Sequence, residues 1–109
     1  MALTDRINWE TLRSIDSSTL TGGYDKLSTP LLHPSYINKL VNNSNVLVTI
    51  SIDGATDIDV APANSYWVYD ESKFTGRSNV ALQQGTQFYV KGSAGVGLIY
   101  FVTQYIENI

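Results

Sequence analysis

An alternation of apolar and polar residues between positions 46 and 52 constrains the fold more than any other feature. Because successive side chains of a strand point to opposite faces, Val46, Val48, Ile50 and Ile52 share one face. Most residues of the run are β-branched and suit a pleated sheet. Asp53 and Gly54 then supply turn chemistry. We expect a central strand here, with its apolar face covered by other strands.

Other β-prone segments recur at short intervals along the chain, and no segment has convincing helical periodicity. We expect strands at 11–20, 24–27, 36–41, 58–60, 66–70, 80–83, 86–91 and 98–106. The polar stretch 42–45 is expected to be a hairpin turn before the central strand. This spacing predicts an all-β fold, a single small antiparallel β-sandwich of jelly-roll type. We assign residues 1–11 to an extended N-terminal arm and 12–109 to the sandwich.

The charge pattern restricts the classes of partner. Charged residues make up only 16% of the chain, and its seven Lys and Arg residues are scattered. Nucleic-acid binding needs clustered basic residues, so we expect no nucleic-acid partner. No apolar run approaches the roughly 20 residues of a membrane span, and the N-terminus lacks signal-peptide patterning. Low charge is typical of surfaces that partners cover, although a β-protein rich in Ser, Thr and Asn has the same composition.

Candidate catalytic residues are few. His33 is the only histidine, and a catalytic role would need a nucleophile or carboxylate that only the fold could bring close. We interpret it as structural or solvent-exposed. The absence of cysteine excludes disulfides and thiolate metal sites. Asp53, Asp57 and Asp59 lack the spacing of a calcium loop, so we interpret them as solvated.

The glycines at 92, 95 and 97 precede a β-prone segment. A phosphate-binding loop would need a helix there, so a hairpin loop is the better interpretation. We therefore expect no cofactor, no metal and no enzymatic activity.

Aromatic residues are candidates for contacts with partners, since exposed large aromatics are costly unless covered. Trp9 with Ile7 could anchor the arm on a neighbouring subunit, or the arm could be a frayed terminus. The loops 71–79 and 92–97 are further candidates. The suspected contact residues are Ile7, Trp9, Tyr36, Trp67, Tyr69, Arg77 and Val96.

From residue 27 to residue 105, several segments resemble a family of small virion proteins of tailed bacteriophages. The closest match to the family's "Gly-Thr-Gln-x-Tyr-Val-Lys" is GTQFYVK at 85–91. The segments LSTPL at 27–31, INKLVNNSN at 37–45, VTISIDG at 48–54 and PANS at 62–65 with Asp70 resemble other family motifs in the same order. Ser28 and Asn45 depart from the family pattern at turn positions.

This resemblance implies a non-enzymatic part of the virion, assembled in the host cytoplasm. It implies a homo-oligomer at the neck, tail or capsid that contacts other virion proteins. The alternative is a carbohydrate-binding sandwich in which Trp67, Tyr69 and Tyr36 stack against sugar rings.

Overall fold

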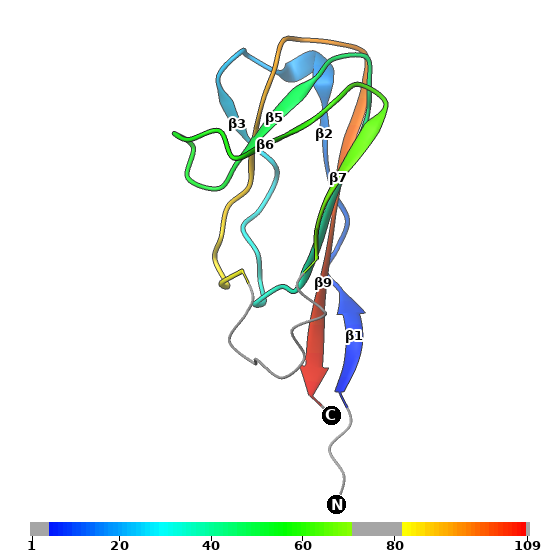
Figure 1. Cartoon of the computed structure of the whole chain (residues 1–109), viewed down its shortest axis with the longest axis vertical. Helices are drawn as coiled ribbons and strands as arrows, with labels where there is room; N and C mark the ends of the chain where they lie inside the picture. Colours follow the sequence, from blue (N-terminus) through cyan, green and yellow to red (C-terminus); the bar gives the residue numbers. More distant parts are fainter. Residues whose placement is uncertain (1–4, 71–81, 109) are drawn as a thin grey trace, which may run out of the picture.

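A computed structural model of the chain describes residues 5–70 and 82–108, with side chains described for 7–70 and 82–105. Two antiparallel sheets face each other, which confirms the predicted all-β sandwich (Figure 1). The first sheet contains β1 (Asp5–Trp9), β2 (Arg13–Asp16), β4 (Ile37–Ser44), β7 (Ser65–Asp70) and β9 (Gly97–Asn108). The second sheet contains β3 (Tyr24–Lys26), β8 (Tyr89–Lys91), β5 (Val48–Ser51) and β6 (Asp59–Ala61).

The longest strand, β9, organises the first sheet. One edge of β9 pairs with β4, and the other edge pairs with β2 and then β1. The segment predicted as an arm therefore contributes β1, which pairs with β9 of the same chain. β4 ends its pairing at Gln104, whereas β1 continues to Asn108. β1 and residues 104–108 of β9 are here called the ribbon. From Tyr105 onward the ribbon is two-stranded and runs beyond the second sheet (Figure 1).

The core lies between the sheets and is built from alternate positions of the strands. In β5, Val48 and Ile50 are fully buried, and β5 lies between β8 and β6. This confirms the predicted central strand. The rings of Phe88 and Phe101 meet across the sheets with centroids 4.4 Å apart. The buried apolar residues are Leu20, Leu27, Leu31, Leu40, Val48, Ile50, Ala61, Phe88, Val90, Ile99 and Phe101.

The predicted turn at 42–45 is wrong. β4 continues to Ser44, and the chain then crosses to the second sheet, so β4 and β5 are not a hairpin. The buried Asn42 side chain explains the difference. Its Nδ2 donates to the carbonyl oxygens of Val46, Ala61 and Pro62 at 2.8, 3.0 and 3.1 Å. A residue with turn chemistry here joins the two sheets from inside the sandwich.

The strand expected at 11–20 is shorter than predicted. It covers only β2, and a 3-10 helix η1 (Ser17–Thr19) follows. Asp16 caps η1, because its Oδ1 accepts from the Ser18 backbone N–H at 3.0 Å. Ile52 is 40% exposed because β5 ends at Ser51, whose hydroxyl accepts from the backbone N–H of Gly54. In the described ranges, no helix is long and apolar enough to span a bilayer.

Candidate interaction surface

The outward side of the first sheet, here called the outer face, is largely apolar. Paired residues in neighbouring strands share a face, so the register defines its members. They are Ile7 and Trp9 of β1, Ser14 and Asp16 of β2, Leu98, Tyr100, Val102 and Gln104 of β9, Ile37, Lys39, Val41 and Asn43 of β4, and Tyr66, Val68 and Asp70 of β7. Tyr66 is 65% exposed and Trp9 is 57% exposed. Contiguous apolar patches of this kind mark interaction sites.

The charges on the outer face are few and nearly balanced. Its described charged side chains are Asp16, Lys39 and Asp70. The exposed side of the second sheet instead carries an ion pair, in which Lys91 Nζ lies 2.9 Å from Asp57 Oδ1. Tyr24 also donates to Asp57 there, and this bond together with Lys91 holds the pKa of Asp57 below its usual value. The two outward surfaces of the sandwich are thus chemically distinct.

The outer face contains a hollow of about 290 Å³ where β4 lies beside β7. Its lining residues are Lys39, Val41, Asn42, Asn43, Asn64, Ser65 and Tyr66. Val41 and Tyr66 are direct cross-strand partners, which places their side chains next to each other. Trp9 lies on the same outer face, on the ribbon, opposite Gln104.

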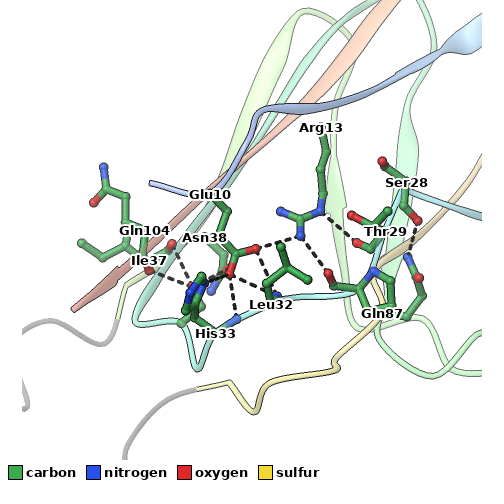
Figure 2. A network of polar contacts seen from close by, with 12 residues as sticks. Glu10, Arg13, Ser28, Thr29, Leu32, His33, Ile37, Asn38, Gln87 and Gln104 are labelled. Atoms are coloured by element: carbon green, nitrogen blue, oxygen red, sulfur yellow. Dashed lines mark hydrogen bonds and ion pairs between the residues drawn. The ribbon is translucent and has the colours of Figure 1, made fainter. Parts of the chain in front are cut away.

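A polar cluster on the inward side of the first sheet, where β1 ends and β2 begins, joins this sheet to the loop 28–35 (Figure 2). The Glu10 and Arg13 side chains are almost fully buried, and their Oε1 and Nη2 atoms lie 2.8 Å apart. Arg13 also donates to the carbonyl oxygens of Thr29 and Pro30. Glu10 Oε2 lies 2.8 Å from His33 Nδ1 and accepts from the His33 backbone N–H. The cluster therefore fixes the loop against the first sheet.

Two opposing effects act on the pKa of Glu10. Burial raises it, while the hydrogen bonds from Arg13, His33 and the Leu32 backbone lower it. The net pKa lies below its ordinary value of 4.5, so the carboxylate is ionised at neutral pH. Both carboxylate oxygens are bound to donors. The fold therefore brings a carboxylate to His33, and the contacts of that carboxylate hold the loop 28–35 in place.

A metal site also needs several ligands in one place. Among the residues that the structure describes, no group of three or more His, Cys, Asp or Glu side chains could hold a metal ion. Asp53 instead caps its own turn by accepting from the backbone N–H groups of Ala55 and Thr56, which lowers its pKa to about 2.

The suspected contact residues do not form one site. Ile7 and Trp9 are exposed on the ribbon, and Val96, which immediately precedes β9, is 75% exposed. Tyr36 is half-buried beside β9, where its backbone N–H donates to Gln104. Arg77 and the loop 71–79 lie outside the described residues.

Trp67 and Tyr69 lie on the inward side of β7 and are half-buried. Their rings stack with centroids 6.5 Å apart, and Trp67 meets Phe88 edge-on at 6.1 Å. The Trp67 indole N–H donates to Asp59 Oδ2 at 2.6 Å. A sugar platform would need these rings on the outside.

Sequence reasoning did not identify Tyr66 and Val68 as surface residues. It assigned Ile37 and Val41 to the inward side of the strand at 36–41, which is wrong, because Asn38 and Leu40 are the buried residues. Alternation separated Tyr66 and Val68 from Trp67 and Tyr69, but did not show which pair faces outward. The cross-strand register decides this, since Trp67 pairs with the buried Leu40. Glu10 was also missed, because a single carboxylate in a mixed N-terminal segment gives no signal of burial. No known protein family, curated protein or solved structure matches the chain.

Proposed function

We propose that this chain is a non-enzymatic structural subunit of a bacteriophage virion that self-associates through the outer face of its first sheet. The observation that carries the proposal is the exposure of Ile7, Trp9, Tyr66, Val68 and Leu98 on one sheet surface. Burying such a surface against a partner is favourable, because apolar area leaves water. A second copy presents the same apolar chemistry.

Charge supports self-association at this face in preference to the second sheet. The chain carries a net charge of −3, so most pairs of surfaces from two copies repel each other weakly. The outer face has one basic and two acidic side chains among its described members, with only Lys39 near the middle. Two such faces meet with little desolvation of charge.

The virion assignment is supported by the sequence segments that resemble phage virion proteins, above all GTQFYVK at 85–91. In the structure this segment contains Phe88 and Val90 of the core. The segment VTISIDG at 48–54 contributes Val48 and Ile50. The resembling segments therefore support the proposed identity of the subunit through its core. The outer face supports the proposed self-association.

A matched pair of substitutions tests the surface. Val68 is 44% exposed on the first sheet, and Val60 is 46% exposed on the second. Sedimentation should give the wild-type chain a molar mass that is a multiple of 12.0 kDa. We expect Val68→Glu to lower that mass and Val60→Glu to leave it unchanged. A wild-type mass of 12.0 kDa at every concentration contradicts self-association.

Membership of a virion is tested separately by quantitative mass spectrometry of purified phage particles whose genome encodes the chain. We expect its peptides at a fixed number of copies per particle after washing at high salt. Loss of the peptides on washing, or their absence from the particles, overturns the virion assignment.

A further inference from the structure

We infer that Trp9 of one copy occupies the hollow of a second copy, and that the exchange is reciprocal in a two-fold dimer. This inference rests on the proposed self-association and specifies its geometry. Trp9 has the largest side chain of the ribbon and is 57% exposed, and the hollow, which Val41 and Tyr66 help to line, lies on the same outer face.

The register of the first sheet makes a reciprocal contact geometrically simple. Trp9 lies opposite Gln104 of β9, and Val41 lies opposite Tyr100. The midpoint between Trp9 and the hollow therefore falls near the paired residues Val102 and Lys39. A two-fold axis in the plane between two outer faces places each Trp9 on the other copy's hollow if it passes through this midpoint and is perpendicular to the line from Trp9 to the hollow. Such an interface is closed, because both copies use the same patch.

The size of the hollow suits one aromatic side chain. Its volume is about 290 Å³, roughly ten times the ~30 Å³ share of one water molecule in the liquid. Pockets for drug-sized ligands are about 300–1,000 Å³. A single bicyclic ring system, anchored on a strand, fits this space better than a free ligand that needs enclosure on most sides.

The lining of the hollow also suits an indole. Val41 and Tyr66 provide apolar and aromatic contact, which an indole ring requires. Lys39 forms no ion pair with any residue in the described ranges and can place its ammonium over the ring face. Asn43 and Ser65 lie at the same hollow and offer polar partners for the indole N–H.

The area of the outer face is sufficient for a specific dimer. With about 3.4 Å per residue and about 4.8 Å per strand, the five strands of the first sheet cover about 570 Å². Two copies in full overlap would then bury about 1,100 Å², which exceeds the roughly 1,000 Å² expected of a biological interface.

A complementation experiment tests the pairing. Trp9→Ala removes the inserted residue, and Tyr66→Glu places a charge at the hollow, each at an exposed position. We expect each variant alone to weaken the dimer by roughly 30-fold or more, as buried aromatic anchors do. A mixture of the two should form a 1:1 heterodimer, since the Tyr66→Glu copy still carries Trp9 and the Trp9→Ala copy still has the hollow. Val60→Glu is the matched control.

The outcomes separate this inference from the proposed function. If the wild-type chain self-associates and Val68→Glu disrupts it, but the mixture stays as weak as each variant alone, the pairing of Trp9 with the hollow is wrong. Dimers that persist in either variant contradict it as well. Thermal unfolding of each variant checks folding, and Val41→Glu provides a second hollow variant if Tyr66→Glu is unstable. A wild-type chain that is always monomeric contradicts the proposed function itself.

Discussion

The His33 ring lies flat against the Tyr105 ring, with centroids 3.7 Å apart and planes within 5° of parallel. On its edge, His33 Nδ1 contacts the buried Glu10 carboxylate at 2.8 Å. The loop 28–35 is therefore held by a side chain that touches β9 and the segment after β1 together. The attachment of this loop depends on Glu10, which binds Arg13 as well.

Glu10→Gln should strongly destabilise the protein. The substitution leaves the buried Arg13 guanidinium without its counter-charge, and breaking a buried ion pair in this way costs about 3–5 kcal/mol. Urea unfolding measures the loss. Asp57→Asn is the matched control, because it removes an ion pair with Lys91 that is half exposed to water. Equal losses in the two variants would contradict a buried role for Glu10.

The unfolding free energy should fall as the pH drops below about 4.5, the ordinary pKa of Glu10. The folded-state pKa lies below this value, so the unfolded chain binds protons first, and stability is lost as the pH falls through the folded-state pKa. Urea unfolding across a pH series should give a shallower decline for Glu10→Gln. Asp16, Asp53 and Asp57 also have lowered pKa values and leave a residual slope in the variant. A decline as steep as that of the wild type would exclude Glu10 as a contributor.

Asn42→Ala should cost about 1–3 kcal/mol, since it removes a buried amide whose Nδ2 donates to three carbonyl oxygens and whose Oδ1 accepts from the Ser44 hydroxyl. The neighbouring Asn43→Ala is the control, because Asn43 is exposed in the same strand. Chemical unfolding should separate the two variants clearly. A small loss for Asn42→Ala would mean that water replaces the amide.

Gly97→Ala should be more destabilising than Gly22→Ala. Both glycines have positive φ, +119° and +90°, so both substitutions strain the backbone by about 1–3 kcal/mol. Only at Gly97 would the new Cβ lie 2.2 Å from a backbone oxygen, that of Asn43, whereas nothing lies within 4 Å at Gly22. The difference between the two melting temperatures therefore measures the steric contact between β9 and β4. Equal decreases in melting temperature would show that the backbone around Gly97 and Asn43 adjusts to the new Cβ at little cost.

Local alternation predicts much of the scaffold. Val48 and Ile50 in the central strand, and Phe88 and Val90 in the segment 86–91, are buried as their spacing indicates. Alternation fails where a polar side chain has distant partners. The Asn42 amide reaches carbonyl oxygens up to 20 residues away, and such partners are invisible in a local pattern.

The candidate surface was harder to predict than the core. The sequence of β7 separates two faces, but both contain a large aromatic residue, and only pairing with β4 shows that Tyr66 faces outward. Trp9 was predicted as a contact residue from its type and terminal position. The structure adds its place on the same face as the hollow, which depends on β1 and β7 flanking β9 and β4.

The central position of β9 also determines when this sheet can form. β1, β2 and β4 all pair with a strand that the ribosome makes after them, and Asp5 meets a partner as distant as Asn108. Closing so long a loop is slow, and unpaired strand edges stay available to other chains in the meantime. The second sheet, whose strands end at Lys91, is complete in the nascent chain before the first sheet. Synthesis of β9 is therefore the step that closes the first sheet, because until then β2 and one edge of β4 have no strand to pair with.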